Sequence, residues 1–183
     1  MLDLIPTHFT ALLPHAARLA LLGFGAAWVA LLVHELGHAI GASATGVRLW
    51  GIRLGTGPVV YEGPIGSLHL RLAWLPLGGT IQLLDADAHE IGYRDVYQRV
   101  WRFTWVPGAW RAPLISAAGP LTSLAVAAIF TAAYVLLAPA GHPGAMLRWS
   151  ALANLAGWLN LIPLGPSDGL HVLRHLAAFR APA

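Results

Sequence analysis

The sequence predicts an α-helical membrane protein with about three transmembrane helices and a small membrane-associated β-sheet between the first and the second. Composition is the first observation: the 183 residues are 57% hydrophobic and only 10% charged, whereas about one-quarter of a soluble domain is charged. The second is that three stretches are long and apolar enough to cross a bilayer, which takes about 20 mainly apolar residues. The length suits a single domain over 1–183.

The three predicted spans differ in what they carry. The first, at about 19–44, includes three ionisable residues in the run WVALLVHELGHAIGASA, and the second, at about 112–140, has no charged residue. The third, at about 146–166, stays mainly apolar until it meets prolines. A cleavable leader is the weaker interpretation of the first span, because its apolar run starts late and cleavage would remove the most unusual residues in the chain.

Arginine placement predicts the orientation in the membrane. The chain contains 11 basic residues, all of them arginine. Most lie in the long loop between the first two spans, so the positive-inside rule puts the N-terminus outside and this loop and the C-terminus in the cytoplasm. The arginines form no dense run, which favours contact with a membrane surface over nucleic acid. We therefore expect a multi-pass protein of a bacterial plasma membrane, since arginine without lysine and abundant alanine are typical of a GC-rich bacterium.

The long loop has structure of its own. Residues 48–84 alternate apolar and polar side chains between glycines and prolines, a pattern that predicts three or four short strands. Residues 90–105 mix arginines with aromatic residues at near-helical spacing. They are predicted to form an interfacial amphipathic segment that leads into the second span.

His34, Glu35 and His38 form the pattern H-E-x-x-H inside the first span. In an α-helix the two histidines lie one turn apart on the same face, where two imidazoles can chelate one zinc ion while the glutamate acts on a water bound to it. A chance match is the weaker interpretation, because ionisable residues inside a span are costly and usually functional. The chain has no cysteine, so any further metal ligand must be His, Asp or Glu.

A catalytic zinc site usually has three protein ligands, so a third must come from elsewhere in the chain. The segment NLIPLGPSDGLHVLRH, residues 160–175, contains prolines and glycines that break a regular helix. Irregular backbone at membrane depth is tolerated only where it is buried in protein or lines a cavity. Its Asn160 and Asp168 would reach a depth similar to that of the histidines. Two other sources of a ligand stay open: the polar turn with Asp85, Asp87, His89 and Glu90, and the helical face of Asp168, His171 and His175.

These motifs, in this order, resemble those of the site-2 protease family of intramembrane zinc metalloproteases, over most of residues 25–175. HELGH resembles the first motif of the family, and NLIPLGPSDG resembles its N-x-x-P-x-P-x-x-D-G motif. Two further motifs, LGTGP and LPLGG, resemble the glycine-containing strands of the family's sheet. AAGPLTS resembles the opening of the family's next span. The chain departs from the family where Gly165, Ser167 and Ser123 replace the usual proline, leucine and asparagine. Without room for a PDZ domain at 139–147, and without a CBS-type domain, it resembles a minimal catalytic core.

The resemblance implies a zinc metalloprotease with one zinc ion per chain. It makes His34, His38 and Asp168 the metal ligands, Glu35 the general base and Asn160 a residue that positions substrate or stabilises the oxyanion. The implied reaction is hydrolysis of peptide bonds in transmembrane or membrane-anchored protein substrates. The expected partners are that substrate and the lipid bilayer, with no nucleic acid.

Two other functions stay open at this point. An inactive relative would keep the fold and act as a binding partner or an immunity-type factor. A small transporter with a polar site at the midplane would suit the broken helix, although it would not explain a glutamate between two chelating histidines.

Overall fold

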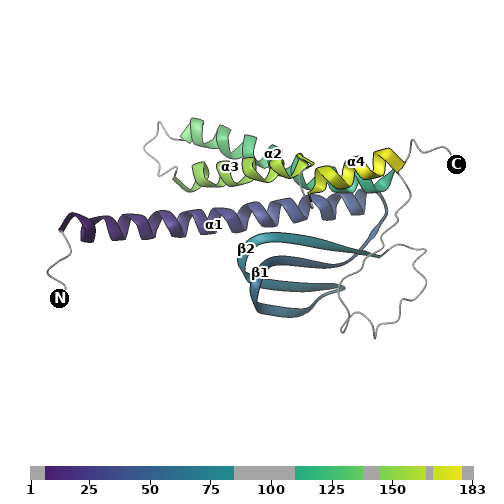
Figure 1. Cartoon of the computed structure of the whole chain (residues 1–183), viewed down its shortest axis with the longest axis horizontal. Coiled ribbons are helices and arrows are strands. Elements are labelled where there is room, and N and C mark those ends of the chain that lie inside the picture. The colour runs from purple at the N-terminus through teal and green to yellow at the C-terminus, as the bar shows by residue number, and fades with distance from the viewer. Residues whose placement is uncertain (1–6, 85–109, 138–144, 164–166, 179–183) are drawn as a thin grey trace.

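The computed structural model of the chain describes residues 7–84, 110–137, 145–163 and 167–178. Figure 1 shows a long first helix along the molecule, with the other helices packed on one side of it and a β-hairpin on the other. The described elements are α1 (Thr7–Ala44), β1 (Arg48–Ile65), β2 (Leu68–Leu84), α2 (Arg111–Leu137), α3 (Ala145–Trp158), the short 3-10 turn η2 (Leu159–Leu161) and α4 (Asp168–Ala178).

Two helices are long and apolar enough to cross a membrane. They are Ala16–Ala44, within α1, and the whole of α2, which correspond to the first and second predicted spans. Among their most exposed side chains are Leu21 and Leu136, at 72% and 76%, as expected for helices that face lipid. A helix is the natural form of such a segment, because a bilayer offers no water to satisfy the backbone.

The third predicted span is not confirmed. Its residues form α3, a helix of 14 residues that continues into η2. This is shorter than the roughly 20 residues that a span needs, and residues 164–166 lie outside the described part of the chain. A third crossing therefore stays a prediction.

A tight turn at the end of α1 leads the chain into β1, beside the helix. Val47 N donates to the Ala42 carbonyl at 2.9 Å and Gly46 N donates to the Ser43 carbonyl at 3.1 Å. These two bonds form a Schellman cap, which requires a left-handed residue, and Gly46 supplies it with a φ of +74°. Val47 then packs with Ala42 and with Ile115 of α2 in the buried core, so that β1 starts directly beside α1.

The sheet consists of two long antiparallel strands, β1 and β2, and not of the three or four short strands that the sequence predicted. The glycines that we expected to end strands bend them instead. Gly55, Gly57 and Gly78 have positive φ, which L-residues with a Cβ rarely adopt, and the pairing register shifts between Leu54 and Thr56. Each strand therefore continues through its glycines.

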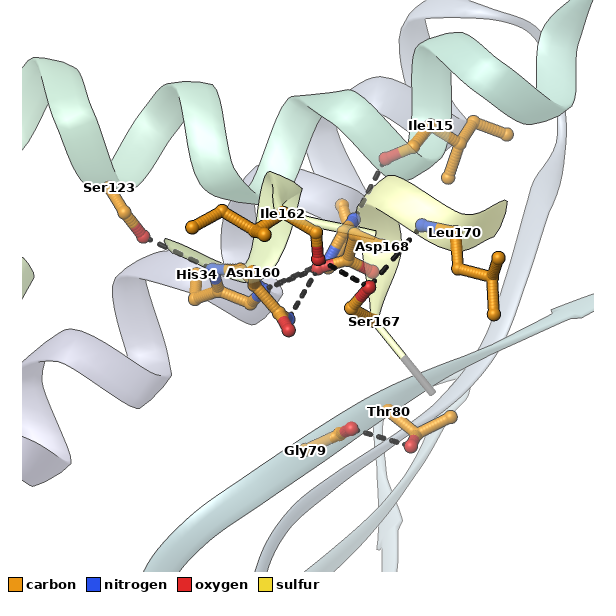
Figure 2. A network of polar contacts seen from close by, with 11 residues as sticks. His34, Gly79, Thr80, Ile115, Ser123, Asn160, Ile162, Ser167, Asp168 and Leu170 are labelled. Carbon is orange, nitrogen blue, oxygen red and sulfur yellow. Dashed lines mark hydrogen bonds and ion pairs between the residues drawn. The ribbon is translucent and has the colours of Figure 1, made fainter. Parts of the chain in front are cut away.

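The bends give the sheet a defined outer edge. Residues 51–54 of β1 pair on one side with 79–82 of β2 and on the other with 69–72, and 69–72 pair in turn with 61–64. Residues 79–84 therefore have a β partner on one side only within the described residues. This edge is the part of the sheet nearest to the polar cluster described next (Figure 2).

Candidate metal centre

Helix α1 places His34, Glu35 and His38 inside the protein. All three are buried, and Glu35 is only 4% exposed. The rings of His34 and His38 meet edge to face with their centroids 4.8 Å apart, as the one-turn spacing predicts. A glycine lets α2 pack against this pair, because a Cβ on Gly119 of α2 would overlap the ring of His38.

Asp168, at the start of α4, completes a cluster of three potential ligands. Its Oδ2 lies 3.0 Å from Nε2 of His34 and 3.4 Å from Nε2 of His38, and the two Nε2 atoms are 3.2 Å apart. Ligand atoms about 2.1 Å from a tetrahedral zinc ion are about 3.4 Å from one another. The three atoms thus form a triangle close to the size that zinc requires. Each of the three residues offers one ligand atom to a metal ion.

The charges in this cluster favour a bound cation. Nδ1 of His38 lies 2.8 Å from the Ile115 carbonyl oxygen, which can only accept a hydrogen bond, so this nitrogen carries the hydrogen. A neutral His38 then presents a lone pair at Nε2, directed at the carboxylate of Asp168. Two electron-rich atoms at this distance repel each other unless a positive charge lies between them, which either a proton or a metal ion would supply.

The chain positions Asp168 through the residue before it. Ser167 Oγ donates to the Ile162 carbonyl at 2.8 Å and accepts from Leu170 N at 3.3 Å. The serine therefore caps the N-terminus of α4 and ties it to the end of η2. Burial disfavours ionised Asp168, but its close contacts with the two histidines outweigh burial and hold the pKa of this carboxyl well below its usual range. Asp168 is thus a carboxylate, the form that binds metal.

Asn160 lies in the same cluster. Its Nδ2 donates to Asp168 Oδ2 at 2.6 Å and lies 3.4 Å from His34 Nε2. Figure 2 shows its side chain beside Asp168. The structure therefore brings together all five residues that the sequence singled out for the site: His34, Glu35, His38, Asn160 and Asp168.

A cavity of about 1110 Å³ opens beside the cluster. Glu35 and Asn160 line it, together with residues 78–81 of β2. Glu35 Oε2 is buried and makes no hydrogen bond within the described residues. A buried carboxylate oxygen without a partner is costly, so it is expected to meet a group that enters this cavity.

The other candidate ligands fare differently. His171 lines the cavity but is not one of the three converging residues. His175 lies in α4, and the structure does not describe its side chain. The polar turn with Asp85, Asp87, His89 and Glu90, like the whole predicted amphipathic segment at 90–105, lies outside the described residues.

The sequence did not reveal three groups that contact the site. They are the Ile115 carbonyl, Gly79 and Ser123, whose Oγ lies 3.2 Å from Nδ1 of His34. Ser123 was visible only as a departure from the family's usual asparagine. Backbone groups such as the Ile115 carbonyl leave no signal in the sequence.

Comparison with known proteins places the chain among metalloproteases. The family model described as peptidase family M50 matches residues 22–141, a region that holds HELGH but not Asp168. A Mycobacterium tuberculosis protein named "Putative zinc metalloprotease Rip2" is 34% identical over 157 residues, which is 81% of this chain and 54% of the relative. A Chlamydia pneumoniae protein named "Putative zinc metalloprotease" is 27% identical over 147 residues, 78% of this chain and 22% of the relative. The chain thus spans between about a fifth and about half of the length of these relatives.

Proposed function

The chain belongs to peptidase family M50, the site-2 protease family, and we propose that it is an intramembrane zinc metalloprotease that hydrolyses peptide bonds of membrane-protein substrates. One observation carries the proposal: His34, His38 and Asp168 converge beside the buried carboxylate of Glu35. The metal ligands come from segments more than 120 residues apart. A purely structural role would not need a fourth ionisable residue, whose carboxylate faces the same cavity with one oxygen unpaired within the described residues.

The three ligand residues suit zinc. Two imidazole nitrogens and one carboxylate oxygen form a typical catalytic ligand set, with the fourth position open. A zinc ion held there would polarise the scissile carbonyl and lower the pKa of a bound water toward about 7. We propose that these three residues bind one zinc ion per chain.

In the proposed mechanism Glu35 moves the proton. It takes a proton from the attacking water and returns it to the leaving amine, acting first as a general base and then as a general acid. Its position suits this role, because it neighbours His34 in the sequence, lines the cavity and has an oxygen without a partner within the described residues. The carboxylate is therefore free to bind water.

Asn160 has one amide hydrogen to spare. An amide nitrogen carries two hydrogens, and one of them goes to Asp168. The nitrogen also lies 3.4 Å from Nε2 of His34. A zinc ion bound to that Nε2 would leave the second hydrogen for a group in the cavity, such as the oxygen that becomes negative when the scissile carbonyl is attacked. We assign Asn160 this stabilising role.

The proposed substrate is a transmembrane or membrane-anchored protein. A helix hides its peptide bonds, so such a substrate must unwind and present an extended segment. Strand addition to a sheet edge would hold that segment by main-chain hydrogen bonds. The strands at 67–84 are the candidates for this purpose. Within these strands, only residues 79–84 offer a free edge for an added strand, because 69–72 already have β partners on both sides.

Replacement of Glu35 by glutamine tests the proposal. The variant keeps the size of the side chain but cannot act as a base, so we expect it to retain zinc and lose at least about 100-fold in the cleavage rate of a transmembrane substrate in proteoliposomes. Glu62→Gln is the matched control, because Glu62 is an exposed residue of β1 that pairs with Arg71. Cleavage by Glu35→Gln at the rate of the unmodified protein would refute the role of Glu35.

A further inference from the structure

His34 has a polar contact outside the metal cluster. Ser123 Oγ of α2 lies 3.2 Å from Nδ1 of His34, the ring nitrogen that does not face Asp168. Ser123 is completely buried, with 0% exposure, so bulk water cannot replace its hydroxyl. Neither the ligand set nor the proposed proton transfer uses this contact (Figure 2).

Helix α3 closes over the serine. A Cβ on Gly157 would come within 2.9 Å of Ser123 Oγ and 3.1 Å of its Cβ, which is closer than such atoms pack. The glycine thus lets α3 lie directly against Ser123. This contact restricts where the hydroxyl can point and keeps it beside His34.

The contact repeats at His38. Nδ1 of His38 donates to the Ile115 carbonyl, so α2 supplies a partner to the second nitrogen of each histidine. Histidines that bind metal almost always donate their other N–H to a carbonyl, a carboxylate or a water, and this bond fixes the tautomer and the ring orientation. The partner of His38 is backbone, whereas the partner of His34 is a side chain that can be replaced.

We propose that Ser123 is a positioning residue for His34. Its Oγ accepts the hydrogen of Nδ1, which leaves a lone pair on Nε2 turned toward His38 and Asp168 and so raises the affinity of the site for zinc. The inference rests on the metal site of the proposed function but not on proteolysis.

Ser123→Ala in the full-length chain tests the inference. Alanine is smaller than serine, so the variant does not overpack the helix interface. Ser150→Ala is the matched control, because Ser150 is another buried serine of the helix bundle. Competition with a fluorescent chelator measures zinc affinity, for which we expect a loss of about 10- to 100-fold in Ser123→Ala and no change in Ser150→Ala.

A second measurement, on the zinc-free protein, separates positioning from a general loss of structure. Ring ¹⁵N spectra of histidine-labelled protein, with the His34 signals assigned by their loss in His34→Gln, report which nitrogen carries the hydrogen. We expect Nδ1 in the unmodified protein and a mixture of both tautomers in Ser123→Ala. Unchanged zinc affinity or an unchanged His34 spectrum would overturn the inference. A protein that binds zinc with these changes but cuts no substrate would refute only the proteolytic function, and one that binds no zinc would refute both.

Discussion

Gly79 of β2 lies against the carboxylate of Glu35 on α1, so closely that a Cβ on residue 79 would overlap it. The backbone of the outer strand thus passes directly beside the proposed general base. Figure 2 shows Gly79 and Thr80 on this strand, next to the cluster that contains His34 and Asp168. An extended substrate added to this edge would therefore be delivered to the proposed catalytic residues.

Gly79→Ala should impair cleavage without removing zinc. The added methyl group must displace either the strand or Glu35, and a displacement of about 1 Å in a catalytic group can cost up to about 100-fold in rate. We expect kcat/KM to fall by about 10- to 100-fold, with unchanged zinc content by mass spectrometry. Gly23→Ala is the control, because a Cβ on Gly23 meets nothing within 4 Å. Equal activity of the two variants would show that the close approach has no catalytic consequence.

Asn160→Ala should lower kcat more than zinc affinity. Loss of one donor to a developing oxyanion typically costs about 100- to 1,000-fold in kcat, whereas Asp168 keeps its contacts with both histidines. Steady-state kinetics and chelator competition measure the two effects separately. If zinc affinity instead falls as steeply as kcat, Asn160 serves to orient Asp168 and not to stabilise the transition state.

Proline in the outer strand should block a substrate that binds by strand addition. Proline has no N–H to donate. Successive N–H groups of a strand point to opposite sides, so one of the two neighbouring residues Thr80 and Ile81 points its N–H away from β1, toward an added strand. Either Thr80→Pro or Ile81→Pro therefore removes this donor. We expect one of the two to reduce cleavage of a helical transmembrane substrate at least about 10-fold, as judged by gel assay in proteoliposomes, since main-chain bonds give this binding mode its affinity.

The opposite edge of the sheet provides the control for this experiment. Residues 61–64 pair only with 69–72, and Val60, next to them, is exposed. Val60→Pro therefore changes an edge strand that does not line the cavity. If Val60→Pro and the two outer-strand variants reduce cleavage equally, the loss comes from damage to the sheet and not from blocked strand addition.

The sequence predicted the spacing of the two histidines better than it predicted the sheet. The one-turn spacing of His34 and His38 is a local property of a helix, and the structure places both residues as expected. A depth argument made Asp168 one of several candidate ligands, because the chain breaks a span there and irregular backbone needs a polar cavity; the resemblance to the site-2 protease family then selected it. The bends of β1 and β2 could not be predicted, because glycine permits a bend and a chain reversal equally well.

Contacts between elements that pack together could not be predicted from the sequence either. Ser123 meets His34 where α2 packs against α1, and Gly79 meets Glu35 where the hairpin that follows the cap at Gly46 packs against α1. Such contacts depend on how elements distant in sequence cross one another. Periodicity within one element carries no information about them.

The zinc content of purified Asp168→Ala tests the metal site most directly. Asp168 is the one proposed ligand on α4, whereas the two histidines lie on α1. A catalytic zinc site needs all three of its protein ligands. By inductively coupled plasma mass spectrometry we predict one zinc ion per chain in the unmodified protein and less than about one-tenth of that in Asp168→Ala, with helix content by circular dichroism showing that the variant is folded. A folded Asp168→Ala protein that retains one zinc ion per chain would contradict the site.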